Sequence, residues 1–110
     1  MIKILLDECL PKKLKYRIEE LDPGFFTKTT PEIGWASLSN GELLSVAEAE
    51  FDVFITSDKN LSFQQSIASC SIQVVLLKAK TNLYEDLLPL VEKMPSIIKA
   101  NEPGKFIELE

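Results

Sequence analysis

Histidine is absent from this chain of 110 residues. Its absence excludes a histidine general base, a Ser-His-Asp or Cys-His triad, and most zinc sites. Any acid–base or metal chemistry must therefore use carboxylates, lysine, tyrosine, cysteine or bound water.

Cysteine and long apolar runs are also scarce. Cys9 and Cys70 are far from any CxxC spacing, so we expect reduced thiols in a cytoplasmic protein and not a disulfide framework. No apolar run is long enough to span a bilayer, and the first residues lack a small-residue cleavage site. We therefore expect no membrane partner and no signal peptide.

Positive charge is in deficit, because 12 Lys and Arg residues face 17 Asp and Glu residues, for a net charge of -5. Bulk electrostatics alone would then hold nucleic acid poorly, unless a divalent cation or a local basic face compensates. The length predicts a single domain over residues 1–110.

Apolar runs and helical spacings alternate along the chain. We expect strands at residues 2–6, 25–30, 53–57, 72–77 and 105–109, and helices at 11–21, 41–50 and 82–98. Asn82 is expected to cap the last helix, and Pro89 to kink or split it. This order predicts an α/β fold, a three-layer α/β/α sandwich with a mostly parallel central sheet.

Carboxylates follow the expected strands. Asp7 and Glu8 end the first strand, Asp58 ends the third, and Glu42 starts the helix after a long loop. These positions share one edge of a parallel sheet, where ligands bind in such folds. Clustered carboxylates need a cation, and Mg²⁺ or Mn²⁺ suits oxygen ligands. The pattern predicts metal-dependent phosphodiester cleavage.

Each acid also has a structural interpretation that stays open. Asp7 could bond backbone amides near the first helix, and Glu8 could be a solvated loop residue. Glu42 could be the return half of a capping box with Ser39. Asp58 could be a residue of the turn that ends its strand.

Several neighbours are candidates for substrate contacts. A basic helix face could steer a phosphate backbone, or could simply be solvated; it includes Lys12 and Lys13. Lys59 and Asn60 could contact phosphate or a metal-bound water. Trp35 could stack on a base, or anchor its loop against the core. Cys9 could be a soft ligand or a packed small residue.

Three segments together resemble one family. The opening IKILLDECLP resembles the (K/I)-x-LLDE-x-LP start of small PIN-like proteins of the DUF5615 type. GWA with NGELL, at residues 34–44, resembles that family's second block, and FITSDKNL, at residues 54–61, resembles its third. The resemblance covers about residues 2–77, and three ordered blocks are more specific than any one.

The resemblance implies an α/β/α sandwich and a VapC-like ribonuclease toxin that depends on Mg²⁺ or Mn²⁺. It implies that Asp7, Glu42 and Asp58 hold the metal and catalyse, with Glu8 a weaker ligand. It implies single-stranded RNA as substrate and an antitoxin protein as partner, and it allows a homodimer. Two departures are Cys9, where Asn is common, and Asn60-Leu61, where Asp-Phe is common.

Two other functions remain open on the residues. A phosphorelay receiver would use Asp7 and Glu8 as its acidic pair, Asp58 as the phosphorylated residue and Lys78 as its lysine. It leaves Glu42 and the long loop unexplained. A non-catalytic PIN-like binding module is the third hypothesis.

Overall fold

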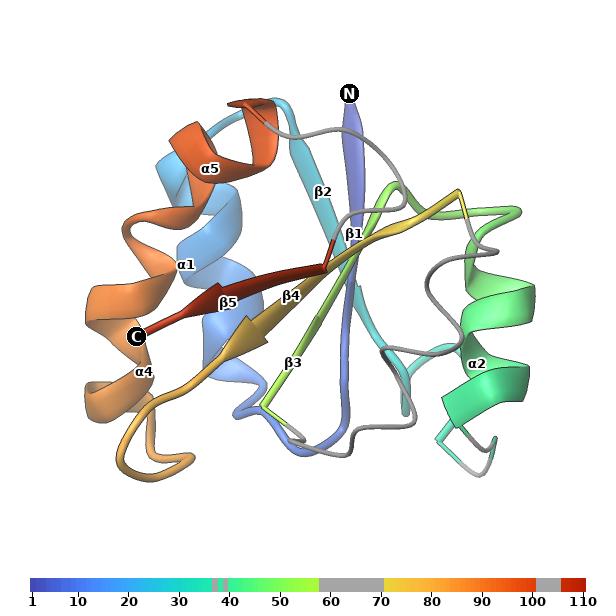
Figure 1. Ribbon diagram of the computed structural model, residues 1–110, viewed down its shortest axis with the longest axis horizontal. Coiled ribbons are helices and arrows are strands. Elements are labelled where there is room, and N and C mark those ends of the chain that lie inside the picture. The colour runs from blue at the N-terminus through green and yellow to red at the C-terminus, as the bar shows by residue number, and fades with distance from the viewer. Residues whose placement is uncertain (37, 39, 58–70, 101–105) are drawn as a thin grey trace.

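The computed structural model describes residues 1–36, 38, 40–57, 71–100 and 106–110 (Figure 1). Within these residues, five strands form one sheet in the order β2-β1-β3-β4-β5, and every pair is parallel. The strands are β1 (Ile2–Leu6), β2 (Phe25–Thr29), β3 (Val53–Thr56), β4 (Gln73–Leu77) and β5 (Phe106–Leu109). The predicted α/β fold is confirmed, with a sheet that is entirely parallel.

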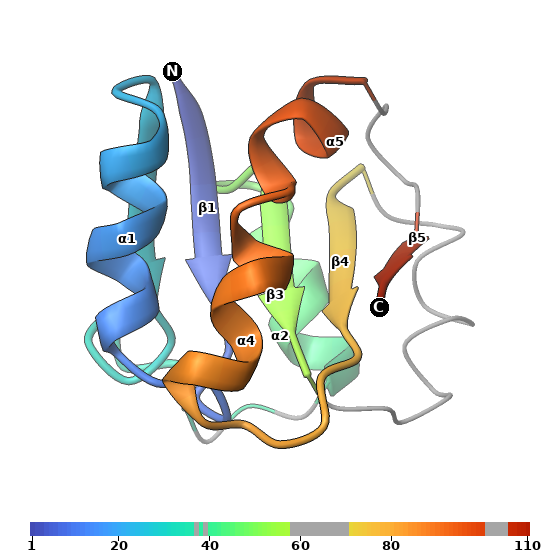
Figure 2. The ribbon, with the colours of Figure 1, turned by 90° about the vertical axis from the view of Figure 1, so that its left-hand side faces the viewer.

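Helices cover both faces of the sheet. The first face carries α1 (Lys13–Leu21), α4 (Tyr84–Val91) and α5 (Met94–Ala100), as Figure 2 shows from that side. The opposite face carries α2 (Asn40–Ala47). These are the three layers of an α/β/α sandwich. No helix in the described part of the chain is long and apolar enough to cross a membrane.

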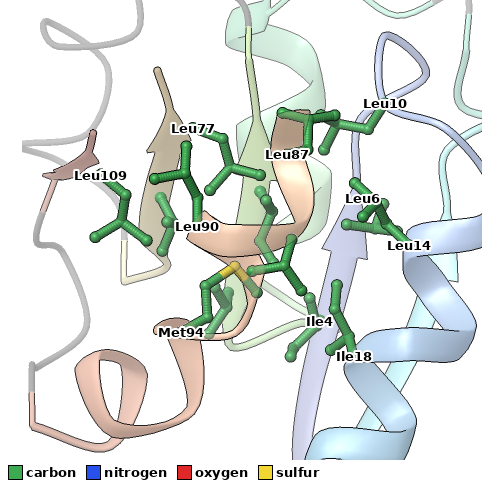
Figure 3. Close-up of a cluster of buried hydrophobic side chains, with 14 of the residues drawn as sticks. Ile4, Leu6, Leu10, Leu14, Ile18, Leu77, Leu87, Leu90, Met94 and Leu109 are labelled. Atoms are coloured by element: carbon green, nitrogen blue, oxygen red, sulfur yellow. The ribbon is translucent and has the colours of Figure 1, made fainter. Parts of the chain in front are cut away.

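Alternation along the strands builds two separate cores. In β1, Ile4 and Leu6 pack under α1, α4 and α5, whereas Leu5 between them packs under α2. Figure 3 shows the first core, where Leu14 and Ile18 of α1 meet β1. Since strands buried on both faces must be apolar throughout, near-continuous apolar runs mark β1, β3 and β4 in the sequence.

The last helix differs from its expected form in two ways. Asn82 is not its cap, because the N-cap position is Leu83, which makes no side-chain cap hydrogen bond. The Thr81 hydroxyl orders the turn before it by accepting the Leu83 N–H at 3.1 Å and donating to the Asp86 carboxylate. The helix is split as expected, but Pro89 lies inside α4 and the break comes at residues 92–93. Pro89 is exposed, so water can satisfy the carbonyl that lacks its donor.

Glu32 joins α1 to the loop after β2. Its carboxylate accepts the Thr29 N–H at 2.7 Å and the Lys15 ammonium at 3.1 Å. Burial acts to raise the pKa of Glu32, but the Thr29 N–H and the charge of Lys15 outweigh it and hold the pKa below the ordinary value of 4.5.

Replacing Glu32 by glutamine is expected to cost about 1 kcal/mol of stability at pH 7. A lowered folded-state pKa gives stability that is present above pH 4.5 and is lost as the pH falls through the folded value. Urea unfolding should therefore show a difference in the free energy of unfolding between wild type and Glu32→Gln at pH 7, and that difference should shrink at pH 3. Glu20→Gln, at an exposed position of α1, is the control. An equal difference at both pH values would contradict a stabilising role for the ionised Glu32 carboxylate.

Candidate functional site

A hollow lies where the strand order reverses. The chain leaves β1 for β2 on one side and then crosses to β3 on the other, so β1 and β3 form the topological switch point at which open α/β sheets bind ligands. The hollow there has a volume of about 330 Å³. Its lining comes from the ends of β1, β2 and β3, the loop after β2, α2 and the turn before α4: Asp7, Glu8, Cys9, Thr30, Trp35, Ala36, Leu38, Leu43, Ser57 and Asn82.

Asp7 is held firmly at this point. Its N–H donates to the Ile55 carbonyl at 2.9 Å, which continues the β1–β3 ladder past the end of β1. One carboxylate oxygen, Oδ1, accepts the Glu8 N–H at 2.8 Å. The other, Oδ2, accepts the Thr56 hydroxyl at 2.7 Å and the Cys9 thiol at 3.3 Å. The local bonds that the sequence allowed for Asp7 are therefore present, in addition to its place on the hollow.

Asp7 retains room for one further partner. A carboxylate offers about four lone-pair positions, and the described residues occupy three of them. The remaining position is on Oδ1, since Oδ2 already accepts two bonds. A hard cation prefers such an oxygen, so Asp7 fits the role of a metal ligand.

Cys9 has two roles here. It packs against the core under α1 and α4, and its thiol also contacts the Ser57 hydroxyl at 3.3 Å. Burial raises the pKa of Cys9, and the hydrogen bonds with Ser57 offset this only in part. Cys9 therefore stays a neutral thiol near neutral pH and donates to Asp7. The packing interpretation is right but incomplete.

The other predicted acids are placed as follows. Glu8 is exposed and lines the same hollow as Asp7. Glu42 lies exposed in the first turn of α2, and its neighbour Leu43, not Glu42 itself, lines the hollow. Asp58 lies outside the described residues, as does Ser39 of the expected capping box. Among the described residues, no three His, Cys, Asp or Glu side chains form a group that could hold a metal.

The residues predicted to contact substrate do not all lie at this hollow. Lys12 lines a second hollow of about 370 Å³, which shares Asp7 and Glu8 with the first. Lys13 is exposed at the first position of α1. Lys59 and Asn60 lie outside the described part of the chain. Asp7 and Glu8 thus form a wall between two hollows, and one of these hollows carries a lysine.

Sequence reasoning missed Thr56 and Thr30. Thr56 is fully buried at the end of β3 and orients Asp7. Thr30 is 1% exposed at the end of β2, and its hydroxyl has no hydrogen-bond partner in the described part of the chain. A polar residue that ends an otherwise apolar strand is the signal that could have identified Thr56, whereas β2 is itself rich in threonine and gives no such signal for Thr30. Trp35 anchors its loop, since it packs edge-on against Phe51 with ring centroids 5.9 Å apart; it also lines the hollow, and stacking on a base stays a prediction.

Comparison of the chain with family models, curated proteins and solved structures finds no match. An argument for function therefore depends on the site itself.

Proposed function

We propose that this protein is a PIN-like, divalent-ion-dependent endoribonuclease with Asp7 at its centre. The observation that carries the proposal is the state of that carboxylate. The Asp7 carboxylate accepts three hydrogen bonds at the switch point, and among the described residues one acceptor position is left, on an open hollow that Glu8 also lines.

Asp7 and Glu8 would hold a Mg²⁺ or Mn²⁺ ion, together with Glu42 and Asp58 as the resemblance implies. Such an ion supplies positive charge beside a phosphodiester and makes water more acidic. It would also offset the negative charge of the acids, which otherwise repels a phosphate.

The chain's own residues have separate tasks in this proposal. Thr56 and Cys9 orient the Asp7 carboxylate by donating to Oδ2, which leaves Oδ1 toward the ligand. Lys12 places positive charge in the adjoining hollow, where it would attract the next phosphate of a strand. A single strand suits two small hollows on either side of one wall better than a duplex does. A cytoplasmic location, an antitoxin partner and a homodimer belong to the same proposal.

The test is cleavage of a short single-stranded RNA labelled at one end. Purified protein with Mn²⁺ is expected to cut it, EDTA to stop the cutting, and excess Mn²⁺ to restore it. Asp58→Asn, purified in parallel, is expected to lose the activity and also controls for a contaminating nuclease. No cutting with either Mn²⁺ or Mg²⁺, or equal cutting by the variant, would overturn the proposal.

A phosphorelay receiver is favoured by one observation, since the strand order 2-1-3-4-5 also occurs in receiver domains. The position of Lys78, the lysine that a receiver would need, does not fit this function. Lys78 pairs with Glu110 at 3.0 Å and Glu108 at 3.3 Å, and it is not among the residues that line the hollow at Asp7. Incubation with a small phosphodonor, followed by intact-mass measurement, separates the two functions, because a stable added phosphate on Asp58 is expected only of a receiver.

A further inference from the structure

The hollow at Asp7 has walls of two kinds. Trp35, Ala36, Leu38 and Leu43 contribute apolar surface from the loop after β2 and from α2. The residues on the strand ends and before α4 contribute carboxylate, thiol, hydroxyl and amide groups: Asp7, Glu8, Cys9, Thr30, Ser57 and Asn82. An apolar surface with a few polar groups is typical of small-molecule sites.

The dimensions and charge limit what can occupy it. A volume of about 330 Å³ is near the lower end of the range for small-molecule sites, about 300–1,000 Å³. Asp7 and Glu8 disfavour an anionic group inside the hollow in the absence of a cation. A purely aliphatic ligand would cover the Asn82 amide without offering it a hydrogen bond. A neutral, planar group with polar edges satisfies all three conditions.

Two further features favour a heteroaromatic ring. Trp35 is half-buried and is backed by Phe51 at an interplanar angle of 80°, so its ring is held by the core while it lines the hollow. Bases stack on such rings with little dependence on sequence. Thr30 lines the same hollow with a buried hydroxyl that lacks a partner among the described residues. Such a group in a native structure requires an explanation, of which a bound partner is one.

We propose that this hollow binds one nucleobase with its sugar, so that the nucleotide's phosphate lies beside Asp7. The inference rests on the proposed function, and it names a base-recognition site for that reaction. Trp35 and Leu43 would contact the faces of the base, and Asn82 and Ser57 would bond its polar edge, since an amide and a hydroxyl each both donate and accept. Base preference would then depend on Asn82.

The chain contains one tryptophan, which is Trp35 itself. Tryptophan fluorescence, excited where tyrosine does not absorb, therefore reports on the surroundings of Trp35. We would titrate the protein with adenosine, guanosine, cytidine and uridine in EDTA, because neutral nucleosides avoid repulsion by Asp7 and need no metal. At least one is expected to change the fluorescence saturably, with a Kd of about 0.1–1 mM. Equilibrium dialysis of the same nucleosides gives a second measurement.

Three variants locate the binding. Ala36→Phe, which fills the hollow, is expected to weaken binding more than tenfold, and Asn82→Ala, which removes a polar edge contact, about tenfold. Leu83→Ala is the matched control, because Leu83 is 58% exposed beside Asn82 but does not line the hollow. It is expected to bind as wild type does. Circular dichroism confirms that each variant folds.

The outcomes separate this inference from the proposed function. Nucleoside binding that Ala36→Phe abolishes supports the base site even if no RNA is cut. No binding of any nucleoside by either measurement, or equal binding by wild type and both hollow variants, overturns the base site even if RNA is cut with Mn²⁺.

Discussion

Replacing Asp7 by asparagine is expected to lower the rate of Mn²⁺-dependent RNA cleavage by at least about 100-fold. Asparagine keeps the shape of the side chain but removes its charge and converts one acceptor oxygen into a donor. The new NH₂ group must face either the Glu8 N–H or the hydroxyl of Thr56, both of which donate to Asp7 in the wild type. We therefore also expect a loss of stability of about 1–3 kcal/mol. Single-turnover cleavage and urea unfolding measure the two effects.

Asp52→Asn is the matched control for this variant. Asp52 lies just before β3, at the opposite edge of the sheet, where its carboxylate accepts the Lys3 N–H at 2.8 Å. The same chemical change there should leave the cleavage rate within about twofold of wild type, because surface substitutions far from a site have small effects. Cleavage by Asp7→Asn at the wild-type rate would remove Asp7 from the mechanism, and an equal loss in both variants would point to instability.

Replacing Phe54 by alanine is expected to cost about 3–5 kcal/mol of folding free energy. Phe54 is fully buried in the middle of β3, and it belongs to the core that holds α2 against the sheet with Leu5, Leu44 and Val74. Its removal leaves a cavity that close-packed neighbours fill only in part. Domains of this size are stable by roughly 5–15 kcal/mol. The urea midpoint should therefore fall steeply, and the variant could be partly unfolded at 37 °C.

Phe26→Ala provides the comparison within the same sheet. Phe26 lies on the edge strand β2, is 37% exposed and has the Lys28 ammonium 5.2 Å from its ring centre. Its removal should cost about 1 kcal/mol or less. An equal loss of folding free energy in Phe54→Ala and Phe26→Ala would contradict the close packing of Phe54 in the core beneath α2.

Much of the fold could be predicted because its physical causes are local. Ile2–Leu6 and Val53–Thr56 are short apolar runs with turn or polar residues at their ends, so their bounds could be located closely. The start of α4 could not, because two neighbouring residues, Thr81 and Asn82, are both able to cap it. In the structure the N-cap position falls to Leu83, and the Thr81 hydroxyl donates to the Asp86 carboxylate, a bond that depends on the geometry of the turn.

The candidate site was predictable in position but not in its contacts. Asp7 could be assigned to the sheet edge from β1 alone, since an acid that follows a buried strand must lie there. Its hydrogen bond with Thr56 joins residues 49 positions apart, and no periodicity in the sequence encodes such a pair. Cys9 illustrates the same limit: its size predicted packing, whereas its donation to Asp7 depends on how the turn after β1 bends.

The central place of β1 also constrains how the protein folds. β1 pairs with β2, about 20 residues later in the chain, and with β3, about 50 residues later. Closing the longer loop costs more chain entropy and slows folding. A growing chain can join β1 to β2 early, yet Asp7 acquires Thr56 and Ser57 as neighbours only when β3 docks. The hollow is thus assembled late, which keeps a partly folded chain from presenting a finished site.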